Sequence, residues 1–275
     1  MISQKQLNTL SAKTKQQFVK RCGKIRYELK GMFNSELLAV AALIDTHNVD
    51  CIIESVRARG HSTEVIASYF SKIPIHSVDY DKNQKGVVYS EKRLKHFSNL
   101  RFHYGDSFDV VPRILRRVKA KSVAVVIDGP KGEDAILLAL QLATFKQVKI
   151  IFIHDLAQSE FERYIAESIF EGSLYTDHVD FVKQFQSLDD DCWSMMKAHQ
   201  SKPYVRGGIK TPSYGPTMGI IFPNSVNAFA AQSYIAFYKK SHNMTIKYLL
   251  LQFSKKIPFL YKTLLGIRAF FHKLF

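Results

Sequence analysis

The stretch Cys51-Ile52-Ile53-Glu54-Ser55-Val56-Arg57-Ala58-Arg59-Gly60-His61-Ser62-Thr63-Glu64 predicts the local structure that decides the fold. It begins as a short apolar run ending in a carboxylate, continues through a small-residue turn to Gly60, and ends in a Ser/Thr/Glu helix start signal. Such a strand, turn and helix place a loop and a helix N-terminus at the carboxyl edge of a sheet. Open α/β folds bind nucleotide-like ligands at this edge, so we expect a cofactor there.

Short β-branched runs recur after this stretch, with helical segments between them. This rhythm indicates βαβ units and an α/β fold with a doubly wound, mostly parallel sheet. The predicted strands are Cys51–Glu54, Ile75–Asp79, Leu100–Tyr104, Val123–Asp128 and Lys149–His154, and the intervening helices cover roughly 62–71, 89–97, 108–118 and 133–145.

Acidic residues mark the ends of the predicted strands. Four runs end at or just before Glu54, Asp79, Asp128 and Asp155, and the remaining one is followed by Gly105-Asp106-Ser107. Each acid taken alone has an ordinary explanation as a turn or cap residue. Because the carboxyl ends of parallel strands share one edge, the five together predict a carboxylate-lined crevice.

Further elements are predicted on either side of the five strands. Ser35–Ile44 is expected to be an apolar helix that covers the sheet, and 179–185 fits either a sixth strand or a helix. Asp189-Asp190-Asp191 is interpreted as a solvated turn or helix cap in preference to a metal cluster. Pro203–Pro216 is expected to form a loop over the crevice, and Met218–Phe222 an antiparallel edge strand.

Charge is concentrated at the two ends of the 275-residue chain. The formal net charge is +15, of which residues 1–31 carry +7 and residues 243–275 carry +6, leaving +2 for the rest. A near-neutral body does not suit a domain that embraces nucleic acid, so no nucleic-acid partner is expected. We predict a basic helical extension over 1–34, an α/β domain over 35–242 and a basic amphipathic helix over 243–275.

Two interpretations remain open for each end. The first 34 residues fit a solvated helix on the body or a surface-seeking arm. The last 33 residues fit an interfacial helix on anionic lipid, or a helix that docks on its own domain or on a partner in a homodimer. Three scattered cysteines and a polar N-terminus favour a reducing compartment, so we expect a cytoplasmic protein, peripheral to a membrane if the last segment binds lipid.

The acid-ended strands and their following loops resemble the class I S-adenosylmethionine-dependent methyltransferases. Within that superfamily, the loop Asp128-Gly129-Pro130-Lys131-Gly132 and the pair His154-Asp155 are most similar to the small-molecule and sugar O-methyltransferases, including those related to cephalosporin hydroxylase. The resemblance covers roughly residues 35–225 and implies a Rossmann-like methyltransferase fold. It is carried by Gly60-His61-Ser62-Thr63, Val78-Asp79, Tyr104-Gly105-Asp106-Ser107 and Val126-Ile127-Asp128-Gly129-Pro130.

The resemblance implies a binding role for each strand end. Asp79 would hold the ribose hydroxyls of S-adenosylmethionine, since a carboxylate accepts both hydrogen bonds, and Asp106 with Ser107 would approach the adenine amino group. Glu54 and the turn after it would lie under the methionine part of the cofactor. The members of this second set are Glu54, Val56, Ala58, Gly60 and Ser62.

The turn departs from the family's pattern of glycine at three alternate positions after the acid. These positions are Val56, Ala58 and Gly60, and only the last is glycine. Valine is β-branched and resists a positive φ. A rearranged turn, weak cofactor binding and a fold that has lost its activity are all consistent with this change.

The chemistry implied for the crevice centres on Asp128. After the fourth strand this carboxylate can act as a base on an acceptor hydroxyl, or bind Mg²⁺ together with Asp155 or His154. Lys131 can stabilise a developing alkoxide. The alternative for Lys131 is an ordinary solvated loop lysine, and the alternative for His154 is a histidine packed in the core without a chemical role.

The sequence therefore predicts an S-adenosylmethionine-dependent O-methyltransferase that acts on a hydroxyl of a sugar, glycan or other small molecule. A catalytically inactive scaffold of the same fold at a membrane surface is the first alternative. Metal-dependent hydroxylation in the same crevice is the second.

Overall fold

The computed structural model describes residues 2–28, 31–158, 160–199, 205–206, 209–210 and 217–242. The chain divides into two compact units, 1–227 and 228–275. In the second unit the structure describes one helix, α10 (Ala228–His242). No helix in the described part of the chain is long and apolar enough to cross a membrane.

The first unit alternates strands and helices over most of its length. Its helices are α1 (Gln4–Cys22), α2 (Asn34–Thr46), α3 (His61–Tyr69), α4 (Lys85–Leu94), α5 (Ser107–Arg117), α6 (Glu133–Ala143), α7 (Phe161–Ile169), α8 (Val179–Phe185) and α9 (Asp190–His199), with short 3-10 turns η1 (Gln186–Asp189) and η2 (Pro223–Ser225). Its strands are β1 (Cys51–Ser55), β2 (Ile75–Asp79), β3 (Leu100–Tyr104), β4 (Val123–Ile127), β5 (Val148–Ile153), β6 (Leu174–Tyr175), β7 (Val205–Arg206), β8 (Ile209–Lys210) and β9 (Gly219–Ile221).

The main sheet has seven strands in the order β3-β2-β1-β4-β5-β9-β6. The first five pair in parallel, and their order is that of a doubly wound Rossmann fold. The strand β9 is antiparallel to both of its neighbours, β5 and β6. This architecture confirms the predicted α/β class and the Rossmann-like methyltransferase fold.

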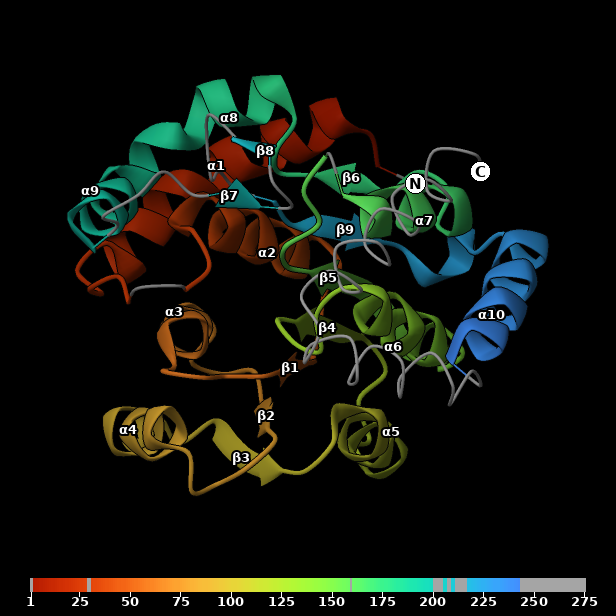
Figure 1. Ribbon diagram of the computed structural model, residues 1–275. Coiled ribbons are helices and arrows are strands. Elements are labelled where there is room, and N and C mark those ends of the chain that lie inside the picture. Colours follow the sequence, from red (N-terminus) through yellow and green to blue (C-terminus); the bar gives the residue numbers. More distant parts are fainter. Residues whose placement is uncertain are drawn as a thin grey trace, which may run out of the picture. The chain divides into compact units, whose positions relative to one another are not determined.

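Helices cover both faces of the sheet, with α2, α3 and α4 on one side and α5 and α6 on the other (Figure 1). All five residues of β4, Val123–Ile127, are buried for this reason. A strand covered on both faces reads as a continuous apolar run, which explains why the parallel strands could be recognised in the sequence. One face packs Ile52, Val126 and Phe152 against the N-terminal helices.

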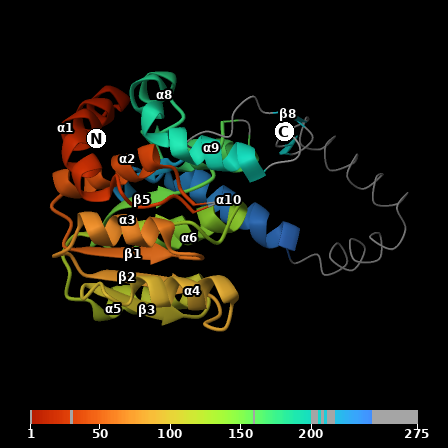
Figure 2. The same cartoon turned by 90° about the vertical axis from the view of Figure 1, so that its left-hand side faces the viewer.

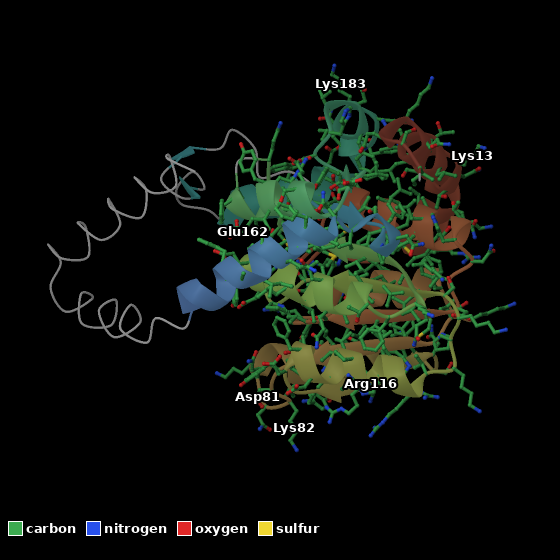
Figure 3. The ribbon with its side chains drawn as sticks, turned by 90° about the vertical axis from the view of Figure 1, so that its right-hand side faces the viewer. Lys13, Asp81, Lys82, Arg116, Glu162 and Lys183 are labelled. Carbon is green, nitrogen blue, oxygen red and sulfur yellow. The ribbon has the colours of Figure 1, made fainter. Side chains whose placement is uncertain are left out.

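The helix α1 belongs to the core, which differs from the predicted extension over 1–34. Leu7 is fully buried, and Phe18 and Cys22 pack in the same apolar cluster as α2 and α3. Figure 2 shows α1 lying beside α2 above the sheet. The labelled Lys13 of α1 points outward (Figure 3), whereas Arg21 near the end of the helix stacks on the ring of Tyr69. The boundary between the two units also falls at 227/228, inside the predicted domain 35–242.

Three smaller expectations are resolved by the structure. The segment 179–185 is the helix α8, and β9 is an interior strand because the two-residue β6 pairs along its outer side. Asp189 is fully buried and its Oδ1 accepts a hydrogen bond from the N–H of Ser35 at 2.9 Å, so it is a cap for α2 and is not solvated. The predicted helix over 243–275, and most of the loop Pro203–Pro216, lie outside the described residues.

Candidate functional site

The turn after β1 has the backbone of a glycine turn although two of its residues are not glycine. Val56, Ala58 and Gly60 have φ angles of 68°, 46° and 85°, all in the left-handed region. For a residue with a Cβ this conformation costs roughly 1–2 kcal/mol, so the surrounding structure must hold it in place. The turn is therefore not rearranged, and its three alternate positions retain the conformation that favours glycine.

Asp79 is one of the groups that hold the turn. Its Oδ2 accepts hydrogen bonds from the backbone N–H groups of Ala58 at 2.9 Å and Arg57 at 3.3 Å, and its Oδ1 accepts from that of Tyr80 at 2.8 Å. A carboxylate has about four acceptor positions, so about one remains for a ligand. The side chain lies at the carboxyl end of β2 as predicted, but it is only 4% exposed. Its role toward ribose stays a prediction, and its role in shaping the turn is evident.

Glu54 fixes the turn from below. It is fully buried, and its carboxylate accepts hydrogen bonds from the hydroxyls of Ser62 at 2.6 Å, Thr63, and Ser77 at 2.8 Å. Burial raises the pKa of Glu54, and these three hydroxyl groups oppose that rise. Glu54 therefore ties β1 to the start of α3 and to β2, and Ser62 contacts Glu54 from the first turn of α3.

Arg57 was missed by the sequence analysis. Its guanidinium is buried, donates to Ser90 Oγ at 3.1 Å and to the Ser77 carbonyl at 3.1 Å, and pairs with Glu91 at 3.2 Å. It also lies 4.6 Å from the ring centroid of Phe102. The local sequence Val56-Arg57-Ala58 did not indicate that Arg57 is buried, because the partners of its guanidinium come from β2, β3 and α4. Arg57 anchors the turn to the sheet edge.

Asp106 and Ser107 begin α5 at the next strand end. Asp106 is exposed, and its Oδ1 accepts from the N–H of Phe108 at 2.8 Å as an N-cap. Ser107 is buried and accepts a hydrogen bond from the hydroxyl of Ser55 at 2.8 Å, while that same hydroxyl also contacts the carbonyl of Gly129. Ser55 thus links the turn region to both Ser107 at the start of α5 and the loop after β4.

A second cluster lies where β4 and β5 end. Lys131 Nζ lies 2.5 Å from Asp128 Oδ1 and 2.8 Å from Asp155 Oδ2. His154 Nδ1 lies 2.8 Å from the same Asp128 oxygen. The structure therefore brings together all four residues predicted for catalysis and metal binding.

Glu36 completes this cluster from the far side, and it too was missed. His154 Nε2 lies 3.3 Å from Glu36 Oε2, which also accepts from the N–H of Phe33 at 2.7 Å. Its other oxygen accepts from the N–H of Thr217 at 2.8 Å. A lone glutamate at the start of an apolar helix was the available signal, since such a residue must be capped or paired once buried.

The protonation of the cluster follows from its three carboxylates. Burial opposes charge on His154, but Glu36 and Asp128 outweigh it and raise its pKa to about 10. Burial likewise opposes charge on Lys131, whose pKa is nevertheless raised by Asp128 and Asp155. Burial would raise the pKa of Asp128, but His154 and Lys131 lower it. At neutral pH His154 and Lys131 are therefore cationic, and Asp128 is ionised between them.

The cluster does not fit the expected magnesium site. The ammonium of Lys131 occupies the position between Asp128 and Asp155 that a cation would take, and both ring nitrogens of His154 already face carboxylates, Nδ1 that of Asp128 at 2.8 Å and Nε2 that of Glu36 at 3.3 Å. Among the residues that the structure describes, no group of three or more His, Cys, Asp or Glu side chains is arranged to hold a metal ion. These residues are therefore not assigned as magnesium ligands.

No family model matches this chain, and no curated protein matches it in sequence. Several solved structures share its fold. The O-methyltransferase TomG from Streptomyces achromogenes, in complex with SAM, is 12% identical, with 81% of this chain and 99% of that chain covered and a TM-score of 0.41. The SAH-bound Podospora anserina methyltransferase PaMTH1 is 10% identical, with coverages of 78% and 87% and a TM-score of 0.38. The methyltransferase domain of bacterial CtHen1 is 14% identical, with coverages of 68% and 97% and a TM-score of 0.38.

These three structures are described as methyltransferases.

Proposed function

We propose that this protein is an S-adenosylmethionine-dependent methyltransferase that transfers the methyl group to an oxygen of a sugar, glycan or other small acceptor. The observation that carries the proposal is the turn Val56–Gly60, whose left-handed φ angles fall at the three positions where the resembling family has glycine. A strained backbone conformation held by buried groups is found chiefly at functional sites. Asp79, Glu54 and Arg57 supply those buried groups here.

The residues present suit the cofactor. The first N–H groups of α3 have no acceptor within the helix, so they are available to the carboxylate of the methionine part. We assign the exposed Asp106 to the adenine, and Asp79 at the carboxyl end of β2 to the ribose. When bound, S-adenosylmethionine supplies an electrophilic methyl group on a sulfonium.

Lys131 and Asp128 are proposed to act on the acceptor. The side chain of Lys131 is 47% exposed and cationic, so it can lower the pKa of an acceptor hydroxyl and stabilise the oxygen as it loses its proton. Asp128, ionised and 14% exposed, accepts a hydrogen bond from that hydroxyl, orients it, and takes its proton as the oxygen bonds to the methyl group and the sulfonium leaves as the neutral thioether. His154 is proposed as a positioning residue, because it contacts Asp128 from the buried side.

Titration calorimetry of the full chain with S-adenosylmethionine and S-adenosylhomocysteine tests the proposal. We expect binding of both, strongly weakened by Asp79→Ala and retained by Asp128→Ala, which should lose transfer to an acceptor. Asp109→Asn is the matched control, since Asp109 is an exposed carboxylate on α5. Folded protein that releases no heat at millimolar ligand would contradict the enzyme proposal.

A non-catalytic scaffold is the second candidate. It is favoured by the engagement of both Asp79 oxygens with backbone N–H groups, which leaves little of that carboxylate for ribose. The same calorimetry separates the methyltransferase from the scaffold, because a scaffold whose Asp79 is fully engaged by the turn should bind neither ligand.

A membrane surface is proposed as the partner of residues 243–275. The argument rests on the sequence, in which this segment holds six basic and no acidic residues with a regular apolar pattern. Deleting 243–275 should abolish sedimentation with phosphatidylserine vesicles. Unchanged sedimentation would leave docking on protein as the role of the segment.

A further inference from the structure

A second polar region lies away from the turn, toward the N-terminal ends of β1 and β2. It is a cavity of about 700 Å³ between the edge of the sheet and α5, within the size range of small-molecule sites. Residues from β2, β3, α5 and the segment after α5 line it. The cavity extends along β3 to Tyr104 at the carboxyl end of that strand, but neither the turn Val56–Gly60 nor Asp79 or Asp128 lines it, so the two sites share none of these residues.

Positive charge dominates the lining of this cavity. Arg101 comes from β3, Arg113 and Arg117 from α5, and Lys119 from the segment that follows α5. In the part of the chain that the structure describes, none of these four side chains pairs with a carboxylate. The acidic residue of the lining, Asp50, already accepts hydrogen bonds from the backbone N–H groups of Lys121 and Ser122.

Two arginines on α5 are like-charged neighbours in this lining, although Arg117 lies in the last turn, where the helix dipole favours a cation. Arg113 and Arg117 are four residues apart and therefore neighbours on one helix face, where like charges destabilise a helix by roughly 0.2–0.5 kcal/mol. Arg101 reaches the same cavity from the strand that the helix faces. An anion bound between helix and strand would remove this repulsion and use the paired N–H donors of the guanidinium groups.

Two histidines on adjacent strands add hydrogen-bonding groups to the lining. The rings of His76 and His103 stack at 5.0 Å, and His76 Nδ1 lies 2.9 Å from His103 Nε2. Burial lowers the pKa of both side chains, with Arg101 acting in the same direction. In a neutral pair one ring donates to the other, so one N–H of the pair is always left for a further acceptor.

We propose that this cavity binds a small soluble anion carrying one or more phosphate groups, at a site separate from the methyl-transfer crevice. Three guanidinium groups and an ammonium match phosphate oxygens in number and charge. The site is a cavity between a helix and a strand, which suits a compact ligand better than an extended polymer or a flat lipid surface.

Inorganic pyrophosphate is the probe for the test. Calorimetry on the full chain at constant ionic strength, with chloride as the reference anion, should show saturable binding near one equivalent. The double variant Arg113→Gln/Arg117→Gln should weaken this binding by about tenfold or more, since it removes two charge-assisted contacts. Arg116→Gln on the same helix, a side chain that packs over Phe145 and is labelled in Figure 3, should leave it unchanged.

Equal loss in the double variant and in Arg116→Gln would overturn the proposal, because it would indicate general attraction to a protein of net charge +15. Absence of binding to the native chain would overturn it too. Tighter binding of an oligonucleotide or of phosphatidylserine vesicles, lost in the same double variant, would replace the small anion by that polymer or surface. In phosphate-free buffer the double variant Arg113→Gln/Arg117→Gln should melt close to the native protein, which shows that the variant used in the binding test is folded.

Discussion

A side-chain carbon added at Gly129 would lie 2.6 Å from Cγ2 of Val56 and 3.1 Å from its Cβ. The two residues belong to different loops, one after β1 and one after β4, and valine at the first leaves room only for glycine at the second. The isopropyl group that replaces a glycine in the turn is therefore accommodated by the loop that carries Asp128.

The Val56–Gly129 contact predicts a dependence between the two positions. Gly129→Ala should destabilise the protein by about 1–3 kcal/mol, as overpacking does, and the same change should cost less in a Val56→Gly background. Urea unfolding of the two single variants and the double variant measures the coupling. Strictly additive changes would contradict direct packing of the two residues.

Val56→Gly alone should also affect ligand binding. Glycine adopts the left-handed conformation at no steric cost, so the loss of packing is partly offset and the space beside the turn widens. We expect tighter binding of S-adenosylhomocysteine, measured by calorimetry, with stability changed by no more than about 1 kcal/mol. Weaker binding in a folded variant would show that Val56 itself contributes to the site.

His154→Gln should be strongly destabilising, by about 3 kcal/mol. The substitution leaves the buried carboxylate of Glu36 facing Asp128 without the cation between them. Urea unfolding at pH 7 gives the value. In the double variant Glu36→Gln/His154→Gln the loss should be smaller than the sum of the single losses.

The pH dependence of stability follows from the same residue. The pKa of His154 is raised from 6.5 to about 10, so its contribution is complete below pH 6.5 and is lost as the pH rises toward 10. The free energy of unfolding should therefore fall between pH 6.5 and 8.5, below the ordinary thiol pKa of 9.0. His154→Gln should reduce this slope, and an unchanged slope would contradict the assignment.

Lys131→Gln should separate binding from transfer. Loss of one preorganised cation beside a developing oxyanion costs about 10²–10³ in turnover, while the cofactor groups around Val56–Gly60 are untouched. Calorimetry with S-adenosylhomocysteine should give an unchanged affinity, and labelled-methyl transfer should fall by that factor. Loss of affinity with turnover retained would exclude the proposed role.

Leu7→Ala tests the place of α1 in the core. The side chain is fully buried, so its truncation should cost about 2–5 kcal/mol. The exposed Val19 on the same helix is a matched control, and Val19→Ala should change stability little. A small change in the free energy of unfolding on Leu7→Ala would contradict the place of α1 in the core and would favour the separate N-terminal extension predicted from the sequence.

Much of the fold could be predicted because parallel strands buried on both faces leave continuous apolar runs such as Val123–Ile127. The meeting of Asp128, His154 and Asp155 could be predicted for a related reason, since they follow neighbouring strands. The predicted metal role does not fit because the ammonium of Lys131 lies between the carboxylates of Asp128 and Asp155.

Other features depend on contacts between residues far apart in the sequence. Glu36 pairs with Thr217 across 181 positions, and Asp189 caps α2 across 154. The outer strand β6 has only two residues, too few for an alternating pattern. In each case the local sequence does not identify the distant partner, so these contacts could not be predicted from it.

Glu36 has a further consequence for how the protein is made. Its carboxylate joins the start of α2, the end of β5 and Thr217, two residues before β9. On the ribosome, Asp128, Lys131 and His154 emerge well before Thr217, so the cluster is assembled while one acceptor of Glu36 still lacks its native donor. The hydrogen bonds of Glu36 are therefore complete only after Thr217 and β9 have been synthesised. A nascent chain that ends before Thr217 lacks one donor to this cluster.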